Sequence, residues 1–306
     1  QAVIASLESV MEADPDHPLA LHLYIHALEA SSNAAKAELA ADRLANLVPG
    51  SGHLVHMPSH IYFRVGRYQD SALANIRAAE VDEAYIAQCN AQGFYPALYY
   101  PHNIHFLWAS ATMQGQSALS LDSARRVVAN VRVEQVEQFP TIQFFRTVPM
   151  LSLVRFAKWE EILEEPEPYE LFAFARAIWH YGRGVAHAAL GDREAALVEL
   201  AAIEALEPQV DEIFMGNVYP ARDLLEIAKS LLRGEMAYRA GDAANAVFAF
   251  EEAVTLQDAL PYTEPPFWYY PTRQSLGAAL LASDRAAEAQ VVFEADLEQY
   301  PMNGWS

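Results

Sequence analysis

Several features are scarce in this sequence, and each shortage excludes a class of structure or function. Of the 306 residues only Cys89 is a cysteine, which excludes a disulfide framework and a cysteine-based zinc site. Lysine and arginine together number 20 against 40 acidic residues, a formal net charge of −20. Nucleic acids and anionic membranes are both bound through clustered basic side chains, so neither is an expected partner.

Long apolar runs and strand signals are missing as well. No run approaches the roughly 20 residues that span a bilayer, and no signal peptide is visible. We therefore expect a soluble protein. Long alternating stretches of β-branched residues are absent, whereas alanine, leucine and glutamate are frequent and apolar residues recur at helical spacing. These features predict an all-α fold.

Short segments that interrupt the helical pattern, or breaks, recur along the chain. In each of them a turn residue is followed by a small residue that lets two helices approach. They are VGRYQDS (65–71), LGDREAA (190–196) and AGDAANA (240–246), with looser copies MQGQSALS (113–120), FAKWEEI (156–162) and ASDRAAEA (282–289). Prolines such as Pro15 and Pro49 follow expected second helices, because proline cannot continue a helix. These two prolines lie 34 residues apart, which is the period of the tetratricopeptide repeat (TPR).

These residues resemble the TPR family, whose helix pairs stack into an α-solenoid. The resemblance implies a single repeat domain over residues 1–306 with about seven pairs. The pairs are placed at about 18–49, 52–83, 101–135, 143–165, 177–208, 227–258 and 270–301. Residues 84–100 are rich in aromatics and interrupt the period as an insertion able to cover a groove.

Four segments carry a narrower resemblance, to a group of bacterial TPR proteins without an established activity. They are HPLALHLYIHALEAS (17–31), GHLVHMPSHIYFRVGRY (52–68), YYPHNIHFL (99–107) and EPPFWYYPTRQSLGAALL (264–281). The resemblance implies a bacterial protein, with both cytoplasm and periplasm open as its compartment. It also implies a further helical part on the N-terminal side, so the chain reads as a fragment of a longer one.

Seven of the ten histidines fall in three short strings. They are His22 and His26, then His53, His56 and His60, then His102 and His105. Spacings of three, four and seven residues place each string on one face of its helix. His22 and His56 are 34 residues apart, as are His26 and His60, so they take equivalent places in consecutive repeats. In TPR arrays these places, and that of Glu29, face the concave groove where ligands bind.

This pattern of residues predicts a metal site. Imidazole is the commonest metal ligand in proteins, and with a carboxylate it suits Zn, Fe, Cu, Mn or Ni. We expect the seven histidines and Glu29 to hold one or two transition-metal ions, with an open position for a metal-dependent reaction on a small substrate. Glu29 is alternatively a general base. The competing hypothesis is a metal-free scaffold that binds a peptide, a protein or a small molecule in the groove.

A few other residues have weaker roles in this prediction. Arg146 and Arg273 are candidates to bind a carboxylate or phosphate group of a substrate. The alternative for each is an ordinary salt bridge. Tyr99 and Tyr100 are candidates to line a substrate pocket. The alternative is that they pack between repeats. Pro58 either kinks a helix or begins one, and in the second case His53 falls in the preceding turn.

Overall fold

All the regular secondary structure in the part of the chain that the structure describes is helical. The structure is a computed structural model that describes residues 2–91, 93, 95–210 and 219–306, and no strand is found in these ranges. The predicted all-α class is therefore confirmed. Within the same ranges, no helix combines the length and the apolar character that crossing a membrane requires.

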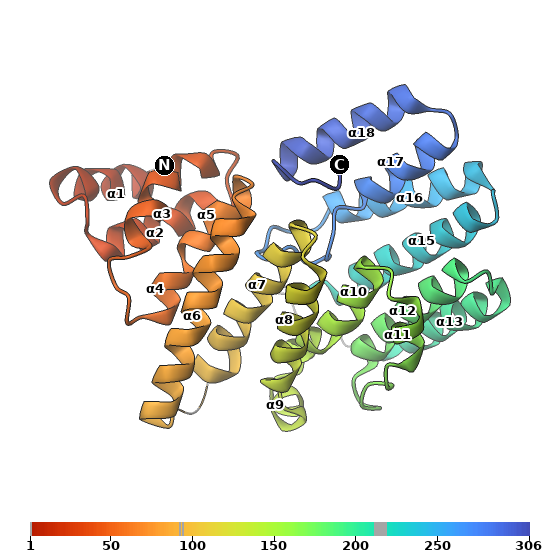
Figure 1. Ribbon diagram of the computed structural model, residues 1–306, viewed down its shortest axis with the longest axis horizontal. Helices are drawn as coiled ribbons and strands as arrows, with labels where there is room; N and C mark the ends of the chain where they lie inside the picture. The colour runs from red at the N-terminus through yellow and green to blue at the C-terminus, as the bar shows by residue number, and fades with distance from the viewer. Residues whose placement is uncertain (1, 92, 94, 211–218) are drawn as a thin grey trace. The chain divides into compact units, whose positions relative to one another are not determined.

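The chain divides into two compact units. Unit 1 comprises the chain up to Asn130 together with Tyr262–Pro265 and Tyr300–Gly304. Its helices are α1 (Ala2–Ala13), α2 (Pro18–Glu29), η1 (Ala34–Ala37), α3 (Glu38–Leu44), α4 (Gly52–His56), α5 (Pro58–Arg64), α6 (Tyr68–Cys89), η2 (Tyr95–Tyr99), α7 (Tyr100–Met113) and α8 (Ser117–Ala129) (Figure 1). All the histidines that were predicted to bind metal belong to this unit.

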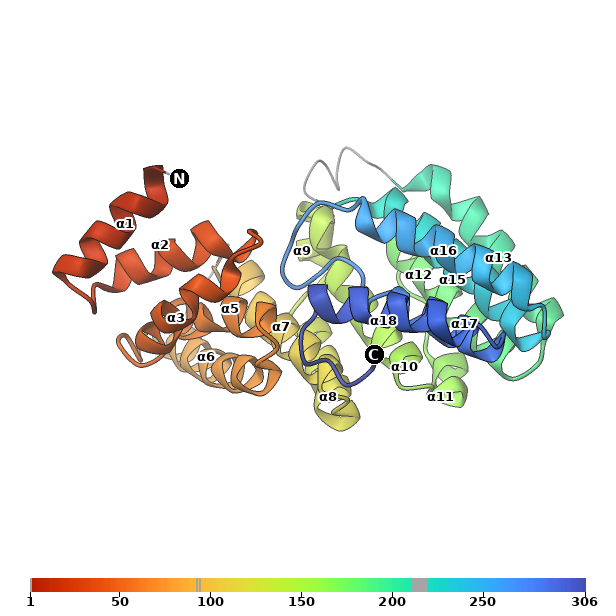
Figure 2. The ribbon, with the colours of Figure 1, turned by 90° about the horizontal axis from the view of Figure 1, so that it is seen from above.

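Unit 2 comprises Val131–Pro261, Pro266–Gln299 and Trp305–Ser306. Its helices are α9 (Val133–Gln138), η3 (Pro140–Thr147), α10 (Val148–Arg155), α11 (Trp159–Glu164), α12 (Ala173–Ala189), α13 (Arg193–Leu206), η4 (Glu207–Gln209), α15 (Ala221–Arg239), α16 (Ala243–Asp258), α17 (Arg273–Ala282) and α18 (Ala286–Gln299). Figure 2 shows α15 and α16 running alongside each other.

Each predicted break lies between two helices that pack against each other. Gly191 and Gly241 have φ values of +87° and +75°, a left-handed conformation that glycine adopts without a steric penalty. The next residue is an aspartate in both breaks, and its side chain caps the following helix. Asp192 accepts a hydrogen bond from the backbone of Ala195, and Asp242 from that of Asn245. Local turn chemistry therefore accounts for these helical hairpins.

Some predicted boundaries are wrong. The third pair was expected to run to residue 135 and the fourth to begin at 143, but the segment between them forms the separate helices α9 and η3. The fourth pair then begins only at α10, where Pro149 occupies the first turn. The sixth pair begins early, because α15 already starts at Ala221. The 34-residue period gives no information about such additional helices.

Residues of α2 and α3 form the core that positions the site in unit 1. Leu21, Ile25 and Leu28 of α2 are buried in one hydrophobic cluster with α3 and α5. Their spacing leaves the neighbouring positions His22 and His26 on an adjacent face of the same helix. At the end of α2, the Arg64 guanidinium donates to the backbone oxygen of Glu29 at 2.7 Å. The core thus fixes the helix that carries the first two histidines and Glu29.

Candidate metal centre

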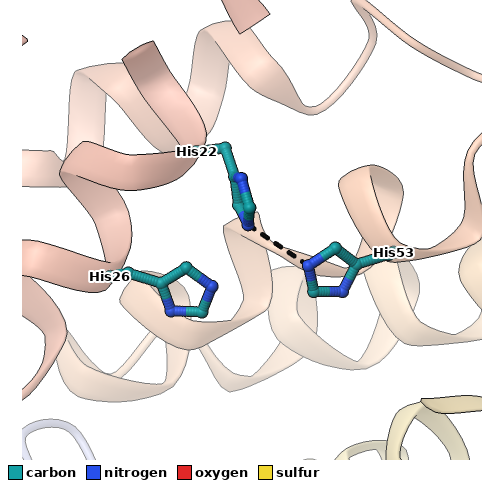
Figure 3. A group of neighbouring side chains, drawn as sticks. All are labelled: His22, His26 and His53. Carbon is teal, nitrogen blue, oxygen red and sulfur yellow. Dashed lines mark hydrogen bonds between the residues drawn. The ribbon is translucent and has the colours of Figure 1, made fainter. Parts of the chain in front are cut away.

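Three imidazoles of α2 and α4 converge on one point. The outer triad consists of His22 and His26 from α2 and His53 from α4, and its candidate ligand nitrogens all lie within 4.8 Å of one another. Figure 3 shows the three rings turned toward a shared space, with His22 Nε2 and His53 Nε2 3.2 Å apart. Two nitrogens bound to one tetrahedral zinc ion at about 2.0–2.1 Å would be about 3.3 Å apart. The spacing of this pair therefore suits coordination of one ion.

A second set of histidines lies deeper in unit 1. The inner triad consists of His56 from α4, His60 from α5 and His102 from α7. The Nε2 atoms of His56 and His60 are 2.8 Å apart, and both residues are almost fully buried. The ring of Phe106 packs against all three imidazoles. The inner triad thus packs on an apolar ring. Because it is buried, water screens the electrostatic attraction between these residues and a cation only weakly.

Pro58 does not remove His53 from this arrangement. It occupies the first turn of α5, and Met57 before it has helical dihedral angles, with φ −49° and ψ −39°. His53 therefore lies in the short helix α4 rather than in a turn, and it faces His22.

Two carboxylates adjoin the inner triad on its other side. The carboxylate triad consists of Glu29, His60 and Glu264, again with candidate ligand atoms within 4.8 Å of one another. Nδ1 of His60 lies 2.6 Å from a Glu29 oxygen and 3.0 Å from a Glu264 oxygen. Glu264 belongs to the short segment 262–265 that completes unit 1. Glu264 belongs to no histidine string, although the fourth segment of the narrower resemblance begins with it.

Hydrogen bonds orient two of the imidazoles. Nδ1 of His26 lies 3.0 Å from Glu29 Oε1, and Nδ1 of His56 lies 2.6 Å from Asn75 Oδ1. The Asn75 amide donates to the backbone oxygen of Ser71, which directs its Oδ1 toward His56. Nδ1 of His56 is therefore the donor, and its Nε2 keeps a lone pair. Metal-binding histidines are commonly held in this way by a carboxylate or a carbonyl on the other ring nitrogen.

A buried aspartate joins the helices that carry these residues. Asp82 of α6 accepts hydrogen bonds from the Tyr95 hydroxyl at 2.7 Å and from the Asn103 amide at 2.8 Å. Gly52 at the start of α4 lies against the same carboxylate, so closely that an added Cβ would be 1.9 Å from Asp82 Oδ1. The glycine thus lets α4 approach α6 and brings His53 into place.

Most of the imidazoles are held neutral. Burial, followed by the neighbouring histidines, lowers the pKa of His22 and lowers that of His53 to about 4. Burial also holds the pKa values of His56 and His102 well below the ordinary value. Neutral imidazole is the form that binds metal, so these four rings have a lone pair available at neutral pH.

His60 and the two glutamates differ from the other members. Burial alone would lower the pKa of His60, but the contacts with Glu264 and Glu29 outweigh it and raise the pKa. Burial would raise the pKa of Glu29, but its contacts with His26 and His60 lower the pKa to about 2. Burial raises the pKa of Glu264. Because both Glu29 oxygens face imidazole nitrogens, its geometry favours a ligand or a ring-orienting group.

The buried carboxylates of the cluster are paired with His60. Glu29 Oε2 and Glu264 Oε2 lie 2.6 and 3.0 Å from its Nδ1, and the Tyr262 hydroxyl donates to Glu264. Imidazole and carboxylate are also the donor set that transition metals prefer. A cation bound among these residues would take the place of the proton that His60 Nδ1 shares with the carboxylates.

The chain matches no protein-family model and no curated protein. The geometry of the histidine cluster is accordingly what supports a function.

The remaining predicted site residues lie in different places. His105 belongs to none of the three triads found in the described residues; its ring is buried and stacks on Trp108, and burial lowers its pKa to about 3. Tyr99 lies beside the outer triad, with its ring 5.3 Å from that of His53. Tyr100 instead donates to Glu83 at 2.6 Å. Of the predicted insertion 84–100, Gln92 and Phe94 lie outside the described residues.

The two predicted substrate-binding arginines belong to unit 2. Arg273 forms a two-point ion pair with Asp258, with distances of 2.7 and 2.6 Å, in agreement with the alternative of an ordinary salt bridge. Arg146 donates to the backbone oxygen of Val131 at 2.6 Å. These contacts give both arginines structural roles within their own unit, and neither belongs to the unit that holds the histidine cluster.

Proposed function

We propose that this chain is a TPR-type metalloprotein whose unit 1 binds transition-metal ions at the histidine cluster. The observation that carries the proposal is the outer triad, in which three imidazoles converge while Glu29 holds Nδ1 of His26. The two tight helical hairpins with a Gly-Asp break support the TPR assignment. The equivalent spacing of His22 with His56, and of His26 with His60, supports it as well.

The outer triad has the ligand set of a catalytic metal site. Three protein ligands leave a fourth position of a tetrahedral ion to water or substrate, whereas structural zinc sites are closed by four. The side chain of His26 is 38% exposed, so a small molecule can reach this triad from solvent. A metal-bound water would have a lowered pKa and would supply a nucleophile at neutral pH. We therefore infer that a reaction on a small substrate takes place here.

The alternative of a metal-free peptide scaffold has less support. The helical turn η2 places Tyr99 against His53, and Tyr95 of the same turn is bonded to Asp82. Tyr99 of the insertion therefore packs on the histidine cluster, as expected for a covered site with a small ligand. The closely spaced imidazoles with lowered pKa values also have no evident role in holding an extended peptide.

Metal analysis tests the proposal. The full chain, produced without a histidine tag and with metal-supplemented growth, is expected to retain at least about one transition-metal ion per molecule. In the double variant His22→Asn/His53→Asn the outer triad loses two of its three ligands, so the metal content should fall by about one ion per chain. Elemental analysis by mass spectrometry provides the measurement.

A matched control removes histidines outside the cluster. His17 caps α2, and asparagine preserves such a cap, while the side chain of His187 lies in unit 2. The variant His17→Asn/His187→Gln should therefore retain the full metal content. The proposal fails if the unmodified chain holds well under one ion per molecule after supplementation, or if both double variants lose metal equally.

A further inference from the structure

His60 faces two ligand sets at once, one with each ring nitrogen. Its Nε2 lies 2.8 Å from His56 Nε2 in the inner triad, where His102 is the third member. Its Nδ1 lies 2.6 Å from Glu29 and 3.0 Å from Glu264 in the carboxylate triad. The two nitrogens of an imidazole point away from each other, so the two sets lie at opposite ends of one ring.

The surroundings of the ring hold it in this position. His60 is 6% exposed, its ring packs against Phe106, and α5 that carries it is buried along most of its length. Glu264 is equally enclosed, since its side chain is 3% exposed. Its carboxylate is held by Nδ1 of His60 and by the Tyr262 hydroxyl. Two carboxylates therefore form a ligand set with one nitrogen of the ring, separate from the set that two imidazoles form with the other nitrogen.

We propose that His60 bridges two metal ions, one bound with His56 and His102 and one bound with Glu29 and Glu264. This inference rests on the proposed function and adds a bridged pair to the ion of the outer triad. The ion bound with His56 and His102 is a transition metal that binds imidazole well, such as copper or zinc. The ion bound with Glu29 and Glu264 is a divalent cation that accepts oxygen ligands. Bridging uses His60 as the imidazolate anion, so neither ring nitrogen keeps a proton, and the N–H protons that the ring carries pass to solvent when the two ions bind.

Copper(II) tests the bridge, because two copper ions that share an imidazolate couple their electron spins. The test uses the full chain with His22→Asn/His53→Asn, which removes the outer triad and leaves all the residues around His60. We expect this variant to bind about two copper ions, as one site on each side of the ring predicts. Integration of its low-temperature electron paramagnetic resonance spectrum should then give far less than two full spins.

Two further substitutions in that background separate the sides of the bridge. Glu264→Gln keeps the size of the side chain and weakens the carboxylate side, so one copper should remain with one full, uncoupled spin. His102→Asn weakens the other side and should likewise restore an uncoupled spin. If the background variant does not fold by circular dichroism, the unmodified chain gives the same test. It should then bind about three copper ions with a spin count near one.

The outcomes distinguish this inference from the proposed function. A single copper bound in the background variant, or two copper ions with two full spins, overturns the bridge and leaves the outer site intact. In the unmodified chain, a spin count equal to the number of bound copper ions overturns it in the same way. Failure of the unmodified chain to bind any copper would contradict both proposals.

Discussion

The second ring nitrogen decides what each histidine of the cluster can do. Nδ1 of His26 is engaged by Glu29 and Nδ1 of His56 by Asn75, so each ring presents Nε2 on its other side. Nδ1 of His60 instead faces two carboxylates. These partners, rather than the histidines alone, determine which lone pairs are available, because a ring that holds its proton on one nitrogen coordinates through the other.

Asn75 provides a test of this point at a residue outside the three triads. Replacing Asn75 with leucine removes the acceptor for His56 Nδ1 and keeps the number and branching of the side-chain heavy atoms. Loss of such an orienting partner typically weakens metal affinity by about 10- to 100-fold. We expect a loss of this size for the ion bound by the inner triad, measured by competition with a chromophoric chelator in the His22→Asn/His53→Asn background.

The matched control for this substitution is Asn75→Asp, which keeps an acceptor oxygen in the same place. It should retain most of the affinity. Equal affinities of the leucine and aspartate variants would show that the hydrogen bond does not orient the ring.

The sequence predicted much of this cluster because helical spacing is a local property. Histidines four residues apart share a helix face wherever the helix lies, so His22 with His26 and His56 with His60 were brought together correctly. His105 was not: its ring stacks on Trp108, while His102 faces the inner triad. A spacing of three residues does not decide the outcome, since His53 and His56 have the same spacing and both belong to the cluster. Glu264 comes from a distant, non-helical segment, and no periodic pattern predicts its contact with His60.

At the scale of the elements, the helix pairs follow from turn chemistry and from small residues at helix contacts. Gly184 of α12 lies against Leu232 of α15, and Gly234 of α15 lies against Phe250 of α16. The Gly-Asp breaks were predictable from the sequence, since a left-handed turn followed by a capping aspartate has a clear signature. The bounds of α9 and η3 were not predicted, because residues 131–147 contain no glycine and hence no Gly-Asp break to mark the turns.

Gly234 provides a test of the close contact between α15 and α16. An added Cβ would lie 2.5 Å from Cε1 of Phe250, a ring that is itself buried. Forcing an atom into such a contact costs about 1–3 kcal/mol, which exceeds the gain of up to about 1 kcal/mol from replacing glycine in a helix. Gly234→Ala should therefore lower the free energy of unfolding in urea.

Two control variants test whether the loss of stability comes from the contact between Gly234 and Phe250. Gly50→Ala should change the stability little, because an added Cβ there has no neighbour within 4 Å. Adding Phe250→Leu to Gly234→Ala should recover part of the loss by making space. A Gly234→Ala variant at least as stable as the unmodified chain would contradict the packing described for this helix pair.

At the scale of the whole molecule, the acidic charge and the buried cluster bear on binding and stability. The formal net charge of −20 favours the approach of cations and disfavours nucleic acid. The cluster buries several imidazoles and two carboxylates close to one another within unit 1. A ligand that binds only the folded chain stabilises it, by about 2.7 kcal/mol at a free concentration 100 times its dissociation constant.

Metal addition should therefore raise the thermal unfolding midpoint of the chelator-treated chain. We expect a clear upward shift with Zn²⁺ or Co²⁺ in differential scanning calorimetry, reversed by chelator. Mg²⁺ should have a much smaller effect, because it prefers an octahedral shell of oxygen ligands over imidazole. The His22→Asn/His53→Asn variant should show a reduced shift. An identical shift with Mg²⁺ would indicate a general response to divalent cations instead of binding at the imidazoles.

The central claim is that a transition-metal ion lies among the imidazoles of unit 1, and anomalous X-ray scattering tests it most directly. Crystals of the full chain grown with Zn²⁺ would be measured on both sides of the zinc absorption edge. The account predicts an anomalous peak that appears only above the edge, at about 2.0–2.1 Å from nitrogens of His22, His26 and His53. An anomalous map with no peak at the histidine cluster, or with zinc only at other positions, would contradict it.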